Sequence, residues 1–398
     1  MPIKIGMVSL GCSKNLVDSE RMLYKFRKRG YELVTEPGLS DIAVVNTCGF
    51  IQSAKEEAIE TILELVKLKE EGTIKKIVVT GCLSERYQQE MADEFPEIDA
   101  VVGIGDQKDI IDILDHVLAN ERVVHFDNKI NLPVTGERII STLPFFAYLK
   151  IAEGCNNCCT YCAIPKIRGP YRSVPMDDVW EEAKWLAENG VTEIIVIAQD
   201  TTRYGEDLYG KSKLPELLEK LCGIDGLKWI RVLYCYPERI TDELLEVIAN
   251  QEKIVKYMDI PIQHCNGEIL KRMNRRGDRQ FLTELMKRIR NKVPDIVIRT
   301  TLITGFPGET QEQFEELAEF VKDMRFDRLG CFAYSPEEDT PAAEFPDQID
   351  DEVKKHRRDI IMEQQAEIMA EKCESMIGKT IKVLFEGFDR YACLLYTS

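Results

Sequence analysis

The first 120 residues alternate short apolar runs with longer segments in which apolar residues recur every three or four positions. Short apolar runs predict buried strands, and the longer periodic segments predict amphipathic helices. The expected strands are residues 3–10, 41–46, 76–80 and 100–102, and the expected helices are 16–28, 53–68, 85–94 and 108–118. Because strands that alternate with helices form βαβ units, we expect an α/β domain with a parallel sheet over residues 1–125.

A second alternating series follows residues 126–145, which lose the pattern and are expected to be a linker. Its expected strands are 147–151, 193–198, 228–233, 256–260, 296–302 and 328–332, and its expected helices are 177–188, 213–222, 242–250, 280–291 and 311–323. Six β/α units predict a partial, TIM-like (β/α)6 barrel over residues 146–375, with its chemistry at the carboxyl ends of the strands.

The chain beyond the barrel begins with a long charged helix, expected at 351–376, and a strand expected at 381–385. We expect residues 376–398 to start a small β-barrel but not to complete it, because one or two strands cannot close a barrel.

Composition narrows the class of protein. No apolar run approaches the roughly 18–20 residues of a membrane span, so we expect no membrane segment. The chain has 69 acidic and 52 basic residues and a net charge of −17. A surface of that sign repels phosphate backbones and attracts basic partners. Thirteen cysteines, an odd number, are a poor disulfide framework and indicate metal or redox sites in a reduced cytoplasm.

Cys155, Cys159 and Cys162 form a C-x-x-x-C-x-x-C pattern directly after the first expected barrel strand. Three thiolates on one tight loop can hold three irons of a 4Fe–4S cluster and leave the fourth iron open for a substrate. Zinc and reduced structural thiols are the alternatives, although a zinc site usually needs a second pair of ligands. Cys158 offers another ligand set, and we interpret it as a bystander.

Cys12, Cys48 and Cys82 each follow the end of an apolar strand, about one βαβ repeat apart, beside Gly11, Gly49 and Gly81. Parallel strands end at one edge of a sheet, so these thiols should converge in one crevice, where glycines allow close backbone approach. The pattern predicts a second metal site. Three buried core cysteines are the alternative.

Together these residues resemble the methylthiotransferase family of the radical S-adenosylmethionine superfamily. The segments LGCSKNLVDSE, IAQDTTRYG, WIRVLYCYPERITDEL, PIQHCNGEILKRMNR and TLITGFPGET are similar to its RimO branch. That branch methylthiolates the β-carbon of an aspartate in the small-subunit ribosomal protein S-twelve. The MiaB branch, which modifies a tRNA adenosine, usually has C-Q-M-N where this chain has C-S-K-N. The acidic charge favours a basic ribosomal protein over a polyanion.

The resemblance implies two 4Fe–4S clusters and S-adenosylmethionine. Cys155, Cys159 and Cys162 would hold the cluster that binds S-adenosylmethionine, and Cys12, Cys48 and Cys82 the auxiliary cluster that delivers sulfur. The cofactor contacts it implies are Gln199, Asp200, Gln263, His264, Arg299, Thr301 and Gly305. For the loop at Gly305, a tight turn is an equally good interpretation. A histidine such as His264, taken alone, is more often a hydrogen-bonded structural residue than a ligand contact.

The resemblance also implies a TRAM domain at the carboxyl terminus, an electron donor of flavodoxin or ferredoxin type, and a monomeric cytoplasmic enzyme. Radical chemistry suits the target, because acid–base groups cannot remove a proton from an unactivated carbon at useful rates. The alternatives are a tRNA methylthiotransferase and a non-catalytic iron–sulfur or zinc scaffold.

Overall fold

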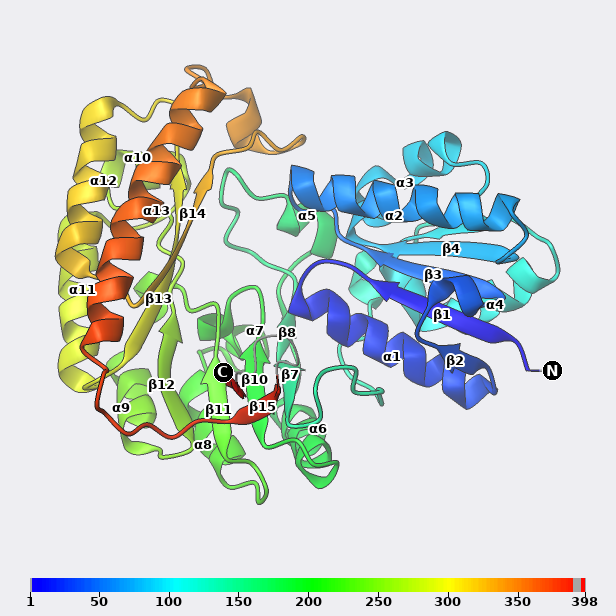
Figure 1. Cartoon of the computed structure of the whole chain (residues 1–398), viewed down its shortest axis with the longest axis horizontal. Helices are drawn as coiled ribbons and strands as arrows, with labels where there is room; N and C mark the ends of the chain where they lie inside the picture. The colour runs from blue at the N-terminus through cyan, green and yellow to red at the C-terminus, as the bar shows by residue number, and fades with distance from the viewer. Residues whose placement is uncertain (1, 389–394, 398) are drawn as a thin grey trace.

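The amino-terminal part of the chain is a parallel sheet with helices on both faces (Figure 1). The computed structural model describes residues 2–388 and 395–397. The sheet order is β2-β1-β3-β4-β5-β6. The strands are β1 (Lys4–Ser9), β2 (Glu32–Val34), β3 (Ile42–Thr47), β4 (Lys76–Gly81), β5 (Ala100–Val102) and β6 (Val123–His125). The helices are α1 (Ser13–Arg29), α2 (Gln52–Glu70), α3 (Cys82–Glu94) and α4 (Ile110–Leu118).

Two separate apolar clusters cover the two faces of this sheet. Helices α1 and α4 pack through Phe26 and Leu114 against one face, which includes Ile42 and Val44. Helices α2 and α3 pack on the opposite face, which includes Val45. All six residues of β3 are buried, as expected for a central parallel strand covered on both sides.

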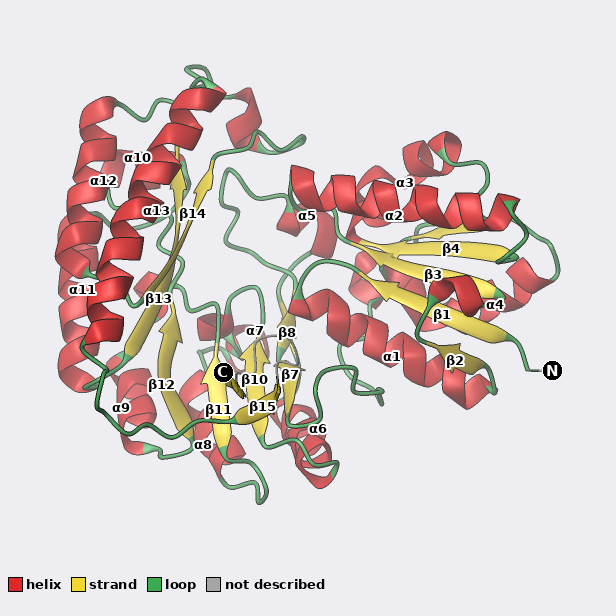
Figure 2. Ribbon diagram, viewed as in Figure 1, coloured by secondary structure: helices red, strands yellow, loops and turns green. Residues whose placement is uncertain are grey.

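The second sheet is also parallel, with the order β14-β13-β12-β11-β10-β7. Its strands are β7 (Phe146–Lys150), β10 (Glu193–Ile197), β11 (Trp229–Val232), β12 (Ile254–Asp259), β13 (Val297–Thr304) and β14 (Arg328–Ala333). The longer helices are α6 (Met176–Glu188), α8 (Leu214–Cys222), α9 (Asp242–Asn250), α11 (Arg279–Lys292), α12 (Gln311–Met324) and α13 (Asp351–Glu374). Figure 2 shows these helices along the outside of the curved sheet. Since β7 and β14 lie at opposite edges, the barrel is partial and open, as predicted.

Short elements complete the barrel. They are β8 (Ala152–Glu153) and β9 (Arg172–Ser173), which pair antiparallel, and the helices α5 (Ile164–Arg168), α7 (Glu206–Tyr209) and α10 (Gly267–Arg272). Helix α5 follows the loop that contains the C-x-x-x-C-x-x-C pattern and lies next to the amino-terminal sheet (Figure 1).

The structure corrects several predicted boundaries. The three-residue strands β2 and β6 were not predicted, because they lie at the edges of the sheet and are only partly buried, unlike the equally short β5, which is buried throughout. The strand expected at 381–385 lies instead at β15 (Phe385–Phe388), which pairs antiparallel with β16 (Leu395–Thr397). The domain boundaries at 125, 145 and 375 stay predictions. Among the helices of the described ranges, none has both the length and the apolar character to cross a bilayer.

The two sheets are joined by buried ionic contacts. Arg138, between β6 and β7, is 1% exposed and donates from Nη1 to Glu20 of α1 at 2.7 Å. On the other side of the contact, Glu337, in the loop after β14, accepts from the Gln52 amide at 3.0 Å and pairs with Arg86 at 3.1 Å. The amino-terminal sheet is therefore fixed beside the carboxyl ends of the barrel strands.

Candidate metal centre

Cys12, Cys48 and Cys82 lie at the ends of three neighbouring strands. Cys12 immediately precedes α1, Cys48 follows β3, and Cys82 is the first residue of α3. Gly11 has a φ of +87°, and a Cβ there would lie 2.7 Å from the Cys48 sulfur. The Cys48 thiol thus packs against the backbone beside Cys12. Both the positive φ and the lack of space for a Cβ require glycine at position 11.

The charges of the amino-terminal thiols affect the pKa values of their neighbours. Burial raises the pKa of Cys82 to about 12, and the charges of Cys12 and Cys48 act in the same direction while Arg168 acts against it. Burial also raises the pKa of Cys48, with Cys12 adding to the effect. The thiols of Cys48 and Cys82 therefore ionise readily only when a cation or metal compensates their charge.

Cys155, Cys159 and Cys162 share the loop between β8 and α5. Gly154, with a φ of +73°, begins this loop, and a Cβ there would overlap the backbone carbonyl of Pro170. The Cys155 sulfur accepts from the Asn157 amide at 3.5 Å. Burial raises the pKa of Cys155 to about 11 and raises that of Cys162 further, with the charge of Cys159 adding to both.

Cys159 has a tyrosine beside its sulfur. The Tyr236 hydroxyl lies 2.9 Å from the Cys159 sulfur, and the Arg275 guanidinium lies 3.9 Å from the centroid of the Tyr236 ring. Cys158 is exposed, with a φ of +51°, whereas Cys159 is buried. The bystander interpretation of Cys158 stays a prediction.

The two cysteine trios are neighbours. Cys82 packs against Ala163 and Ile167, and Ala163 directly follows Cys162. Helix α5 is thus the element through which the loop of one trio contacts the other.

The donor sets fit iron–sulfur clusters. All six thiols are free of disulfides. Across residues 2–388 and 395–397, no three Cys, His, Asp or Glu side chains are grouped to hold a single metal ion. A 4Fe–4S cluster does not need such a group, because each thiolate binds a different iron. The role of the six cysteines as ligands stays a prediction.

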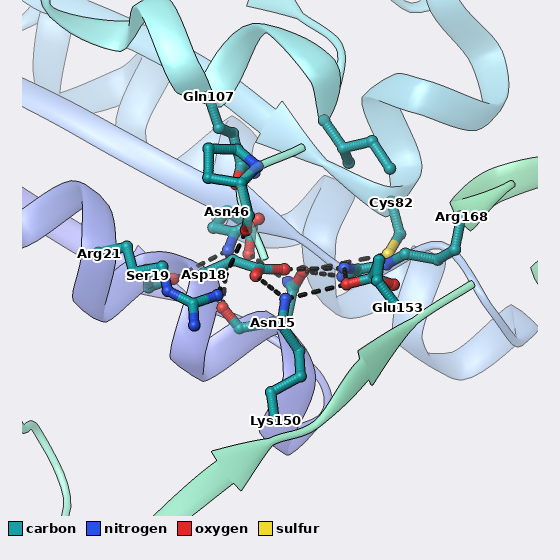
Figure 3. A network of polar contacts seen from close by, with 12 residues as sticks. Asn15, Asp18, Ser19, Arg21, Asn46, Cys82, Gln107, Lys150, Glu153 and Arg168 are labelled. Atoms are coloured by element: carbon teal, nitrogen blue, oxygen red, sulfur yellow. Dashed lines mark hydrogen bonds and ion pairs between the residues drawn. The ribbon is translucent and has the colours of Figure 1, made fainter. Parts of the chain in front are cut away.

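A buried ion cluster, made of Asp18, Lys150, Glu153 and Arg168, lies beside Cys82 (Figure 3). Lys150 contacts Asp18 and pairs with Glu153 at 2.9 Å. Arg168 donates from Nη1 to Asp18 at 2.7 Å and to Glu153 at 3.1 Å. Burial opposes the charge of Arg168, but the Cys82 thiol, Glu153, Asp18 and Cys12 outweigh it and raise the pKa of Arg168 well above its usual value.

Of the predicted cofactor contacts, Asp200 contacts the cysteine loop directly. It is fully buried and accepts from Asn157 at 2.9 Å, and Gln199 beside it is half-buried. Gln263 has a φ of +71°, and its backbone N–H donates a hydrogen bond to the Thr301 carbonyl on β13 at 2.8 Å. Arg299, on the same strand, pairs with Asp259 at 2.7 Å.

His264 and Gly305 meet at a different place, the carboxylate of Glu309. The His264 ring lies 3.5 Å from Glu309, and the Gly305 amide donates to it at 2.9 Å. Arg357 of α13 pairs with the same carboxylate at 2.8 Å. This arrangement packs α13 onto the barrel. The cofactor roles of all seven residues stay predictions.

The polar residues beside the cysteines were not predicted from the sequence. Lys150, Glu153 and Arg168 flank the C-x-x-x-C-x-x-C loop, and Asp18 stands in the quoted segment LGCSKNLVDSE. The available signal was a charged residue at a strand position, as Lys150 is in the run AYLKI. Charges at buried positions are normally paired.

Comparison with known proteins gives matches in both halves of the chain. The radical SAM superfamily matches residues 149–321, and an uncharacterized protein family, UPF0004, matches residues 4–103. The ribosomal protein uS12 methylthiotransferase RimO of Lachnoclostridium phytofermentans is 54% identical over 97% of this chain and 88% of its own length. The protein of the same name from Clostridioides difficile is 51% identical over 96% and 87%.

Among solved structures, the chain is similar to the radical S-adenosylmethionine methyltransferase TsrM from Kitasatospora setae. The TM-score is 0.65 at 12% identity, over 86% of this chain and 77% of that chain. The radical enzyme OxsB is similar with a TM-score of 0.57 at 11% identity, over 100% and 64%. At these identities the likeness concerns the fold alone.

Proposed function

The chain belongs to the RimO family of methylthiotransferases within the radical S-adenosylmethionine superfamily, and on this basis we propose that it adds a methylthio group to the β-carbon of an aspartate in ribosomal protein uS12. The superfamily implies S-adenosylmethionine and one 4Fe–4S cluster. We extend this to two clusters, one at each cysteine trio. An electron donor of flavodoxin or ferredoxin type, a monomeric state and a cytoplasmic location are part of the proposal and follow from the family resemblance alone.

The observation that carries the proposal is the proximity of the two trios. A reaction that removes hydrogen at one centre and adds sulfur from another needs both centres at one substrate atom. The packing of Cys82 on Ala163, next to Cys162, supports this arrangement. A non-catalytic scaffold would not need two thiol trios from different parts of the fold to lie next to each other.

The protein's own residues hold and orient the reactants. Cys155, Cys159 and Cys162 would bind one cluster and Cys12, Cys48 and Cys82 the other. When bound, the clusters and S-adenosylmethionine supply the radical and the sulfur. Asp200, fully buried, accepts from Asn157 of the cysteine loop at 2.9 Å and from the Thr202 hydroxyl at 2.5 Å, so it holds that loop in place.

The proposed activity is tested by anaerobic incubation of the reconstituted protein with dithionite, S-adenosylmethionine and uS12, followed by mass spectrometry of uS12. We expect the mass of a methylthio group on one aspartate, and iron and sulfide contents near two clusters, about eight of each per chain. The variant with Cys12, Cys48 and Cys82 replaced by alanine should hold half the iron, still cleave S-adenosylmethionine, and leave uS12 unmodified. Modification of tRNA in a parallel incubation, with uS12 unchanged, would assign the substrate of the rival branch.

A further inference from the structure

Arg168 reaches from the loop of one cysteine trio to the residues that arrange the other. It ends α5, is 1% exposed, and donates from Nη2 to the Asn15 side-chain oxygen at 2.8 Å. Its Nη1 is held by Asp18 and Glu153 at 2.7 and 3.1 Å. A planar guanidinium with hydrogen-bond partners on both Nη1 and Nη2 has a fixed orientation.

Asn15 in turn contacts the backbone next to the auxiliary cysteines. Its Nδ2 lies within hydrogen-bond distance of the carbonyls of Leu10, Asn46 and Thr47, at 2.8, 3.2 and 3.1 Å. Thr47 directly precedes Cys48, and Leu10 stands two residues before Cys12. One buried amide therefore joins the two strand ends from which Cys12 and Cys48 project.

The same amide reaches the third cysteine. The Cys82 sulfur lies 4.0 Å from the Asn15 Oδ1, the oxygen that accepts from Arg168 (Figure 3). Asn15 is 1% exposed, so its hydrogen bonds are not exchanged for water. All three auxiliary cysteines are thus positioned around a side chain that Arg168 orients.

We propose that Arg168 and Asn15 form a relay that sets the distance and orientation between the two cluster sites. Both are positioning residues, and the proposal rests on the proposed function. Because Arg168 lies at the end of α5, a movement of α5 or of the loop that ends at Cys162 also moves the Arg168 guanidinium. Through Asn15, that movement is passed on to the strand ends of the amino-terminal sheet that carry Cys12 and Cys48. A lysine at 168 would keep the charge but would present one nitrogen in place of the planar fork, so it would not reproduce the separate contacts of Nη1 with Asp18 and Nη2 with Asn15.

The variants are Arg168→Lys, Arg168→Met and Asn15→Ala, with Arg138→Met as the matched control. Arg138 is also a buried arginine that joins α1 to the barrel side, but it pairs with Glu20 and not with Asn15. Asn15→Ala leaves the buried ion cluster intact, so it decides the question if the Arg168 variants fail to fold or to take up iron.

Two measurements are made on the reconstituted proteins. The first is the magnetic coupling between the two reduced clusters, seen as broadening of their electron paramagnetic resonance signals without substrate. The second is the number of methylthio groups transferred to uS12 per 5′-deoxyadenosine released. In the relay variants we expect altered coupling and a fall in the transfer ratio of about tenfold to a hundredfold, the scale on which misplaced reactants lose rate. The control loosens the contact between α1 and the segment before β7 but leaves the Arg168–Asn15 contact in place, so both values should change much less than in the relay variants.

Wild-type coupling and transfer ratio in Asn15→Ala and in the folded Arg168 variants would overturn the proposal. So would an equal change in Arg138→Met, because the effect would then be a general loosening between the sheets. If the unaltered protein does not modify uS12, the proposed function fails, whereas the magnetic coupling still decides whether the relay positions the clusters.

Discussion

Replacing Arg138 by methionine removes the charge that ties the segment before β7 to α1, while keeping most of the apolar stem. Arg138 donates to Glu20 at 2.7 Å and lies 3.0 Å from Glu182, and both arginine and Glu20 side chains are almost fully buried. The substitution leaves the Glu20 carboxylate buried with only the Ser141 amide and hydroxyl, at 2.7 and 2.8 Å.

The expected cost follows from this burial. Removing one partner of a buried ion pair costs about 3–5 kcal/mol. Because Ser141 still satisfies one oxygen of Glu20, we expect the lower end, about 3 kcal/mol, or roughly a hundredfold increase in opening of this segment.

Amide hydrogen exchange measures that opening directly, because the Ile139 amide donates to the Glu20 carbonyl at 3.1 Å. We expect the protection of Ile139 in Arg138→Met to fall about a hundredfold. The matched control is Glu137→Gln, which removes a pair with Lys28 at 3.7 Å in which the side chains are 66% and 70% exposed. Such an exposed pair is screened by water and contributes little. Unchanged protection in Arg138→Met, or an equal fall in Glu137→Gln, would refute the reasoning.

Three further substitutions test the cysteine sites. In Gly11→Ala the added Cβ would lie 2.7 Å from the Cys48 sulfur, so the substitution should displace this thiol and lower iron uptake. Gly30→Ala is the control, because Gly30 has a similar φ and nothing within 4 Å of an added Cβ, and it should leave iron uptake unchanged. Cys158→Ala should keep cluster absorbance and 5′-deoxyadenosine yield, and loss of either would make this exposed cysteine a ligand. Tyr236→Phe removes the hydroxyl 2.9 Å from the Cys159 sulfur. Losing about 1 kcal/mol of hydrogen bonding to the reduced cluster should lower its potential by roughly 40 mV in a redox titration, and an unchanged potential would contradict this role.

The architecture was predictable because its signal is local. Buried strands such as β3 and β4 are marked by continuous apolar runs, and amphipathic helices such as α12 are long enough for their periodicity to be recognised. The edge strands β2 and β6 are only partly buried, so their sequences are less distinct than the wholly buried apolar run of β5, which is equally short. The convergence of Cys12, Cys48 and Cys82 followed from the rule that parallel strands end at one edge.

The contacts between the sheets were not predictable from the same patterns. Arg168 meets Asp18 across 150 positions, and no periodicity links the two. His264 and Gly305 appeared as cofactor contacts only through the family resemblance, and the structure places them on Glu309 beneath α13. Tertiary packing decides such pairs, so they become visible only when the chain is folded.

The Arg168 contacts also have a consequence for biosynthesis. Asn15 and Asp18 leave the ribosome long before Arg168, which follows Asp18 by 150 residues. At a synthesis rate of about 5–20 residues per second, Arg168 is made roughly 8–30 s after Asp18 of α1. During that interval the polar face of α1 stays hydrated and the strand ends near Cys12 and Cys48 lack the arginine that orients Asn15. The buried ion cluster beside Cys82 can therefore form only after the chain as far as Arg168 has been translated.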